Sequence, residues 1–506
     1  MTKAQEIAAG YATDGKALEL GAVMIDGTPD PGAAVRLPLA MLNRHGLVAG
    51  ATGSGKTKTL QLLAEQLSAA GVPVVLADVK GDLSGLAEPG AGAAGDRVTK
   101  RSEQTGDDWR PEAFPVQFLS LGTGGKGVPI RATITSFGPI LLSKVLGLNE
   151  TQESTLGLIF HWADQRGLAL LDLKDLRSVI THLTSDEGKD DLKGIGGVAP
   201  ATAGVILRAL SNLEAQGGAE FFGEPELDVR DLTRQVDGRG VLNLLELDEL
   251  QSKPALFSTF LMWLLAELFE EFPEEGDLDA PKLVFFFDEA HLLFDGASSA
   301  FLDRIEQTVK LIRSKGIGVF FCTQLPTDVP NAVLSQLGAR IQHALRAFTP
   351  DDQKALSRTV KTYPVTDAYD LEKALTSLGI GEAIVTVLSE RGVPTPVAWT
   401  LLRAPRSKMG SIGAEAVRAA AGASQLWAKY GETIDRESAY ERLAARVAPA
   451  EPERAPERAP EREPEKAEPG FLRQAMDNPA VRSFVRSAAS SLGREITRGL
   501  FGTRRR

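Results

Sequence analysis

Residues 50–57 constrain the fold of this chain more than any other feature. They read Gly-Ala-Thr-Gly-Ser-Gly-Lys-Thr and match G-x-x-x-x-G-K-[ST] at every defined position. Residues 47–49 before them predict a short buried strand, and residues 56–70 predict a helix with leucines at helical spacing. Glycines let a backbone come close to polyphosphate, and a helix N-terminus attracts negative charge. In this strand–turn–helix setting the motif predicts a phosphate-binding loop (Walker A) rather than an ordinary Gly-rich turn.

The chemistry of such a loop predicts roles for its residues. Lys56 is expected to bind the β- and γ-phosphates of a nucleotide, and it is predicted to be both a nucleotide-binding and a catalytic residue. Thr57 is expected to ligate Mg²⁺. The predicted nucleotide-binding residues are Gly50, Ala51, Thr52, Gly53, Ser54, Gly55, Lys56, Thr57 and Lys58.

Residues 283–287 (Leu-Val-Phe-Phe-Phe) predict a buried strand that ends in two carboxylates, Asp288 and Glu289. We expect Asp288 to hold Mg²⁺ through water and Glu289 to polarise the attacking water (Walker B). The alternative is a hydrophobic strand capped by solvated acids. The letters D-E-A-H that begin at Asp288 also occur in two-domain helicases, but residues 292–448 leave too little chain for a second domain of that kind. His291 is therefore predicted to make local hydrogen bonds.

Polar side chains follow other predicted strands. Thr323 and Gln324 follow the strand at 318–322, so Gln324 is expected to sense the γ-phosphate or to orient water; alternatively it ends the strand in a turn with Pro326. Cys322 is predicted to be a buried small hydrophobe. Asp78, which follows the strand at 72–77, could contact the Mg²⁺ shell or Lys56, or it could instead cap the next turn.

Three arginines are candidates for contact with a neighbouring subunit's nucleotide. Arg313 ends the helix predicted at 298–315, where it is either an arginine finger or a cation favoured by the helix dipole. Arg340 and Arg346 flank the strand predicted at 341–345 and are weaker candidates.

Strands and helices alternate along most of the chain. The other predicted strands are 115–120, 241–245 and a terminal hairpin of 381–388 and 396–402. The other predicted helices are 140–148, 150–166, 173–185, 202–216 and 255–272. This alternation predicts an α/β fold with a mainly parallel sheet and flanking helices. The Gly- and charge-rich residues 89–112 predict a long surface loop.

Composition limits the classes to which the chain can belong. With 506 residues it can form several domains, or one large core with an insertion. One Cys excludes an intramolecular disulfide framework, and the five His are too scattered to suggest a zinc site. A net charge of −11 means that any contact with nucleic acid needs local positive charge. The N-terminus has no apolar run typical of a secretory signal, and the apolar stretches are too short to span a bilayer, so we expect a cytoplasmic protein.

The end of the chain differs in composition from the rest. Residues 449–469 are rich in Pro, Glu and Arg and predict a disordered linker. Residues 471–506 hold eight Arg against Asp477 and Glu495, a local charge of +6, with an apolar stripe at helical spacing. They predict a basic amphipathic tail that binds lipid, nucleic acid or a partner, or that only solubilises the terminus.

In combination these motifs resemble the HerA/FtsK-like P-loop ATPases, and among them the bacterial proteins with a HerA-like helicase C-terminal domain (YjgR type). The resemblance covers about residues 15 to 410, and its motifs are LNRHG, AGATGSGKTKTLQ, ADVKGDLSGL, PIRATITSFGPILLSKVLGLNETQ, VFFFDEAHLLF, IRSKGIGVFFCTQLPTDVP and GVPTPVAWTLLRAPRSKMG. It implies a RecA-like core that binds ATP and works as a hexameric ring. It also favours Arg313 as a finger acting in trans and Gln324 as the sensor. Two departures are Val79 in place of the family's Pro, and about 40 N-terminal residues where archaeal relatives have a β-barrel.

The predicted domain organisation follows from these segments. It comprises a lead-in at 1–40, a RecA-like ATPase core at 41–135 and 236–410, a helical insertion at 136–235, C-terminal helices at 411–448, a disordered linker at 449–469 and a basic tail at 470–506.

Three functions are compatible with this organisation. The first is an ATP-driven ring of identical subunits that moves on DNA. The second is an ATPase that acts on a protein, peripheral to a membrane, through residues 470–506. The third, a nucleotide switch without motor activity, is disfavoured because a pure binder does not need Glu289.

Overall fold

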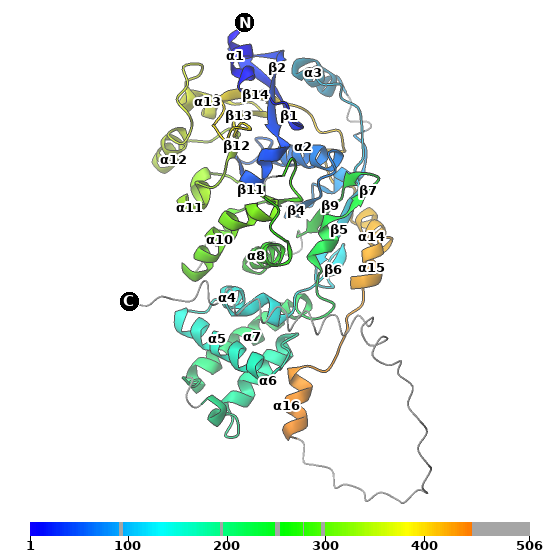
Figure 1. Ribbon diagram of the computed structural model, residues 1–506, viewed down its shortest axis with the longest axis vertical. Helices are drawn as coiled ribbons and strands as arrows, with labels where there is room; N and C mark the ends of the chain where they lie inside the picture. Colours follow the sequence, from blue (N-terminus) through cyan, green and yellow to red (C-terminus); the bar gives the residue numbers. More distant parts are fainter. Residues whose placement is uncertain (91–94, 193–195, 248–253, 277, 295–298, 448–506) are drawn as a thin grey trace, which may run out of the picture. The chain divides into compact units, whose positions relative to one another are not determined.

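The computed structural model describes residues 1–90, 95–192, 196–247, 254–276, 278–294 and 299–447 (Figure 1). The predicted linker at 449–469 and the basic tail at 470–506 lie outside the described residues.

One twelve-stranded sheet runs through the described part of the chain. Its order is β2 (Thr28–Pro38), β1 (Ala17–Ile25), β14 (Ala398–Leu402), β13 (Glu382–Thr386), β12 (Ala339–Gln342), β3 (Gly46–Ala49), β11 (Ile317–Thr323), β10 (Leu283–Phe287), β4 (Val74–Asp78), β9 (Leu242–Glu246), β5 (Val116–Leu121) and β6 (Val128–Ile130). Strands β12 to β6 are parallel, whereas β13, β14, β1 and β2 each pair antiparallel with their neighbour. The predicted α/β fold with a mainly parallel sheet is confirmed.

The central strands are continuous apolar runs because both faces of the sheet are covered. All residues of β3, β4, β9, β10 and β11 are buried. A Cβ at Gly46 would lie 2.2 Å from the Phe320 ring, so only glycine lets this aromatic side chain pack over β3. The helices that follow the central strands are α2 (Lys56–Ala69), α8 (Pro254–Glu271), α9 (His291–Phe294), α10 (Ser299–Ile312) and α11 (Asn331–Leu334).

Four helices between β6 and the two-stranded ribbon β7–β8 (Gln235–Val236, Arg239–Gly240) form a separate group, drawn in cyan to green in Figure 1. They are α4 (Ile134–Leu146), α5 (Glu150–Gln165), α6 (Leu173–Thr184) and α7 (Pro200–Ala215). Capping boxes at Asn149 and Asp172 begin α5 and α6. Helix α4 contacts α8 and α10, which connects this group to the helices beside the sheet.

Two segments differ from the prediction. Residues 1–40, expected to be a lead-in, form α1 (Lys3–Ala9) and the strands β1 and β2, which extend the sheet. The prediction of a long loop at 89–112 is wrong for residues 96–105, which form helix α3 (Asp96–Thr105). This helix packs against β1, β2 and β14 and ends at Gly106, a left-handed residue with φ 62°. The charged, Gly-rich composition does not predict this helix, because its stability comes from tertiary contacts.

The segments near the end of the described chain contact both the sheet and the helical group. Helices α12 (Pro350–Val360) and α13 (Leu371–Ser377) lie beside β12 and β13 (Figure 1). The C-terminal helices are α14 (Ala414–Gly422), α15 (Gln425–Tyr430) and α16 (Ala439–Val447), which contact β5, β6 and α6 respectively. Among the residues described, no helix is both long and apolar enough to cross a bilayer.

Candidate active site

The phosphate-binding loop begins where β3 ends, and two neighbouring backbone segments accept hydrogen bonds from its first two residues. Gly50 N–H donates to Thr323 O at 3.2 Å, and Ala51 N–H donates to Ala344 O at 2.8 Å. Gly50 has φ 153°, and a Cβ there would lie 2.5 Å from the Cβ of His343. Glycine is therefore required at the first position of the loop by both conformation and space.

Lys56 is 8% exposed and points back into the loop. Its Nζ donates to Gly50 O at 2.6 Å and to Ala51 O at 3.3 Å. The side chain of Lys58 takes a different direction, because its Nζ donates to Gln61 Oε1 at 3.1 Å on the next turn of α2. Thr57 lies in the first turn of α2, and the hydroxyl of Ser54 is buried without a hydrogen-bond partner among the described residues.

Asp288 and Glu289 follow β10, which is separated from β3 by β11 alone. Asp288 is 8% exposed, and burial, followed by the charge of Glu289, raises the pKa of its carboxyl group. Glu289 has φ 48°, an uncommon left-handed conformation for a side chain of this kind, and its N–H donates to Asp288 Oδ1 at 2.9 Å. The structure thus brings both predicted carboxylates to the sheet edge that carries the loop.

Glu289 contacts two cationic or titratable side chains. Its Oε1 lies 3.0 Å from the Nζ of Lys80, and its Oε2 lies 3.4 Å from the Nδ1 of His291. Partial burial by itself lowers the pKa of Lys80, but the hydrogen bond and charge of Glu289 outweigh it and raise that pKa. Lys80 was not singled out by the sequence, although it lies in the Asp-Val-Lys-Gly-Asp segment after β4.

Asp78 caps the turn that carries Lys80. Its Oδ1 accepts from the N–H groups of Lys80, Gly81 and Asp82 at 3.2, 2.8 and 3.3 Å, and its Oδ2 accepts from Leu83 N–H at 2.8 Å. Burial raises the pKa of Asp78 to about 6. Of the two roles left open for this residue, turn capping is what the structure shows.

Gln324 and Arg313 lie at opposite ends of β11. Gln324 is exposed just beyond the strand's carboxyl end, beside the loop and β10. Arg313 is exposed in the 3₁₀ turn Arg313–Lys315 that precedes the strand. Because β11 has seven residues, these two positions are about 20 Å apart, so Arg313 cannot reach the loop of its own chain.

Of the two weaker arginine candidates, one lies away from the phosphate-binding loop and the other contacts it. Arg340 donates to Thr362 O at 3.2 Å, away from the loop, whereas Arg346 Nη2 donates to Thr52 O at 3.4 Å. The strand predicted at 341–345 is shorter in the structure because residues 343–346 leave β12 and run alongside the loop.

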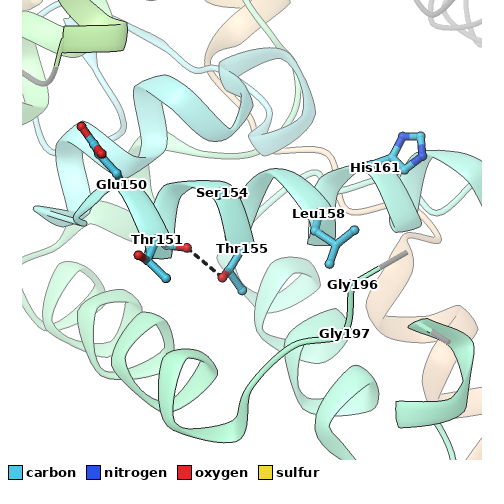
Figure 2. Close-up of a pocket in the computed structure, with 8 residues that line it drawn as sticks. All are labelled: Glu150, Thr151, Ser154, Thr155, Leu158, His161, Gly196 and Gly197. Carbon is cyan, nitrogen blue, oxygen red and sulfur yellow. Dashed lines mark hydrogen bonds between the residues drawn. The ribbon is translucent and has the colours of Figure 1, made fainter. Parts of the chain in front are cut away.

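A hollow of about 720 Å³ elsewhere in the molecule is unrelated to this edge (Figure 2). One face of α5 and the segment before α7 line this hollow with Glu150, Thr151, Ser154, Thr155, Leu158, His161, Gly196 and Gly197. Over the described ranges, no group of three or more His, Cys, Asp or Glu is arranged to hold a metal ion.

Comparison with protein families identifies the family of the chain that carries this site. The model of the family described as helicase HerA-like C-terminal matches residues 24–506. The chain belongs to this HerA-like family. A search of curated proteins found no match.

Solved structures show that the HerA-like chain has the fold of P-loop ATPases. The bacterial conjugative coupling protein TrwBdeltaN70 in its unbound form is 15% identical, with 81% of this chain and 95% of that chain covered and a TM-score of 0.52. VirB4 of Thermoanaerobacter pseudethanolicus is 16% identical, with 78% and 98% covered and a TM-score of 0.51. TrwB in complex with the ATP analogue ADPNP is 17% identical, with 80% and 94% covered and a TM-score of 0.51. The expected RecA-like core is confirmed.

Sequence reasoning missed two residues of the HerA-like chain whose contacts connect helix α2, which begins at the loop, to distant parts of the sequence. His343 lies beneath the loop, where its Nε2 is 2.8 Å from the hydroxyl of Thr59, and burial lowers its pKa to about 4. Glu65 on α2 accepts from Arg406 N–H at 2.8 Å and from Ser407 N–H at 2.9 Å. These partners are hundreds of residues apart in the sequence, so no local pattern could reveal them.

Proposed function

We propose that this chain is a Mg²⁺-dependent ATPase that assembles as a hexameric ring and moves DNA. The observation that carries the proposal is the meeting of Lys56, Asp288, Glu289 and Gln324 at one edge of the sheet. Membership of the HerA-like family supports the choice of ATP hydrolysis as the reaction.

The residues of the loop fit a nucleotide and a divalent cation. Ser54 Oγ is buried without a partner among the described residues, as expected of a group reserved for a ligand. Asp288 is a buried carboxylate with a second negative charge beside it, and Thr57 offers a hydroxyl, so the two residues provide the hard oxygen ligands that Mg²⁺ prefers. When bound, Mg²⁺ would neutralise charge that develops on the phosphates.

The proposed reaction assigns one task to each side chain. The ammonium group of Lys56 exchanges the carbonyls of Gly50 and Ala51 for β- and γ-phosphate oxygens. Backbone N–H groups of the loop from Thr52 onward surround the phosphates, because those of Gly50 and Ala51 already donate to backbone carbonyls. Glu289 turns from Lys80 to polarise water in line with the γ-phosphate, and Gln324 orients that water.

A ring and a DNA partner are proposed from different observations. Arg313 lies on the edge opposite its own loop, so as a catalytic group it would serve a neighbouring subunit. The family description names a helicase, and the structural neighbour TrwB is named as a conjugative coupling protein. DNA in the cytoplasm is therefore the first substrate to test. Action on a protein at a membrane surface, through the basic residues 470–506, is the second.

The test is steady-state ATP hydrolysis with double-stranded DNA, single-stranded DNA or anionic liposomes, with Glu289→Gln as the blank and particle mass measured on the same samples. We expect DNA to stimulate hydrolysis by a hexamer-sized species, and Glu289→Gln to lose at least about 100-fold in turnover while retaining ATP binding. Stimulation by liposomes alone would favour the second substrate. An absence of hydrolysis under all conditions would contradict the proposed activity.

A further inference from the structure

Two large apolar side chains stand exposed beside the phosphate-binding loop. Phe348 is 83% exposed and Ile380 is 76% exposed. A single exposed hydrophobic residue needs no explanation. These two differ from an ordinary surface pair because the backbone segments that carry them are both hydrogen-bonded to the loop.

The segment that carries Phe348 runs along the first half of the loop. Ala344 O accepts from Ala51 N–H at 2.8 Å, and the guanidinium group of Arg346 donates to Thr52 O at 3.4 Å. Phe348 N–H then donates to Asp352 Oδ2 at 3.1 Å, which fixes the start of α12. The phenyl ring is thus attached two residues beyond a contact with the loop itself.

The turn that carries Ile380 is held even more firmly. Gly381 N–H donates to Ser54 O at 3.3 Å. The guanidinium group of Arg101, on α3, donates to the carbonyls of Ile380, Gly381 and Leu402 at 3.2 to 3.3 Å. A charged group shared among three carbonyls fixes the position of this turn. An apolar side chain held in place yet exposed is prepared for a contact that the isolated chain does not make.

The strand order fixes the direction in which a bound nucleotide must lie. The carboxylates and Gln324 are on the β11–β10 side of β3, so the γ-phosphate must face that side. The opposite end of the nucleotide must then lie toward β12 and β13 (Figure 1). Phe348 follows β12 and Ile380 precedes β13. The exposed apolar pair therefore occupies the side where the base of the nucleotide must be.

We propose that Phe348 and Ile380 are the contact surface for the nucleobase of ATP, an inference that rests on the proposed ATPase function. A purine has an extended π-face that stacks on an aromatic ring and packs against an aliphatic side chain, and nucleotide pockets are typically apolar at this end. Arg346, on the same segment, adds a cation beside the loop. No base-specific hydrogen bond is needed, so the surface selects for a base over bare phosphate.

The test compares a ligand that has a base with one that lacks it, using calorimetry on the full chain with Mg²⁺. Phe348→Ala is expected to weaken ADP binding about tenfold, the lower half of the range for loss of base–aromatic stacking, and to change binding of inorganic tripolyphosphate by less than about twofold. Phe348→Tyr should bind ADP like the wild type. Val365→Ser removes another fully exposed side chain, on the loop between α12 and α13, and should change neither ligand.

A second variant reports proximity directly. In Phe348→Trp, ADP should change the fluorescence of the new indole and tripolyphosphate should not. Equal losses for both ligands in Phe348→Ala would overturn the inference, as would a change only in oligomer mass, which would assign the surface to a second copy of the chain. If the wild type binds neither ligand, the proposed ATPase function fails as well, so the two failures are distinguishable.

Discussion

Glu289, which we propose to polarise water, has one carboxylate oxygen in an ion pair, whereas its Oε2 has no hydrogen-bond partner among the described residues. Lys80 lies 3.0 Å from one oxygen and His291 lies 3.4 Å from the other. A carboxylate oxygen that accepts a hydrogen bond from an ammonium group has one fewer position at which to accept one from water. Hydrolysis therefore requires that Glu289 leave Lys80, so the ion pair opposes turnover until a nucleotide or partner displaces it.

Replacing Lys80 by Met is expected to raise the rate of ATP hydrolysis without a partner about two- to fivefold. The ion pair is partly exposed, with 44% of the Lys80 side chain accessible, so its worth is limited to about 1 kcal/mol. Steady-state hydrolysis in the absence of DNA measures the effect. Lys80→Arg preserves the pair and should stay near the wild-type rate. A fall toward the rate of Glu289→Gln would mean instead that Lys80 assists the reaction.

What the sequence predicts at the residue scale depends on the range of the contacts involved. The loop and the carboxylate pair are local patterns beside strands, so their placement follows from the order of residues alone. Lys80, His343 and Arg346 contact the site across 209, 284 and 294 residues of sequence. Such contacts depend on strand order, which the sequence does not state.

At the scale of elements, hydrogen bonds connect helix α2 to residues 406–408, which follow β14. Glu65, buried on α2, accepts from the N–H groups of Arg406 and Ser407 and from the Ser407 hydroxyl. Gln61, one turn earlier, donates to Ser407 Oγ at 2.6 Å and to Lys408 O at 3.0 Å. The helix that begins at the phosphate-binding loop is therefore held to residues 406–408, and burial raises the pKa of Glu65.

Glu65→Leu is expected to destabilise the chain by about 2 to 4 kcal/mol, because the part-buried N–H of Arg406 and the buried N–H of Ser407 lose their acceptor. Urea unfolding measures the loss, and trypsin should cut faster after Arg406 and Lys408. Glu65→Gln keeps one acceptor oxygen, so its loss should be smaller. Unchanged stability and cleavage in Glu65→Leu would show that residues 406–408 are held by other contacts.

His45 joins two further elements, and its contacts require a neutral ring. Its Nε2–H donates to Val309 O on α10 at 2.7 Å, and its Nδ1 accepts from Val319 N–H on β11 at 3.1 Å. A second proton, on Nδ1, would place an N–H of the ring against the N–H of Val319. Burial, reinforced by the charge of Arg313, lowers the pKa of His45 to about 4.

The stability that His45 contributes should therefore depend on pH. A histidine with a folded pKa below its unfolded value of about 6.5 contributes fully above that value and loses its contribution as pH falls toward the folded pKa. The difference in unfolding free energy between the wild type and His45→Gln should shrink by about 2 kcal/mol from pH 7.5 to pH 4.5. Urea unfolding at these two values avoids the pI of about 5.3. Other titrating groups are common to both proteins, so a constant difference would contradict the prediction.

Prediction of elements from the sequence succeeds where hydrophobic periodicity decides. Strand β10 matches its predicted bounds because five apolar residues lie between polar ones. Helix α3 was missed because its sequence is polar and its stability comes from β1, β2 and β14. The strands β1 and β2 alternate poorly and contain Gly and Pro, so only their pairing at the edge of the sheet identifies them.

At the scale of the whole molecule, the residues that we propose for catalysis lie at two opposite edges of the sheet. The loop, the carboxylates and Gln324 lie at the carboxyl ends of the strands, whereas Arg313 lies at the amino end of β11, close enough to His45 to lower its pKa. A ring in which each subunit presents Arg313 to the next subunit's loop would complete the site, and this arrangement can be tested by mixing subunits.

Subunits with Arg313→Ala keep an intact loop but lack the arginine, whereas subunits with Lys56→Ala lack a working loop but keep the arginine. Each homogeneous variant should hydrolyse ATP at least about 100-fold more slowly than the wild type. In an equimolar mixture, half of the intact loops would face an intact Arg313 if subunits combine at random, so about a quarter of the wild-type rate should return. Arg340→Ala, which removes an arginine remote from the loop, serves as the control and should be active without mixing. A mixture as slow as its components, in rings shown to exchange subunits, would exclude action of Arg313 in trans.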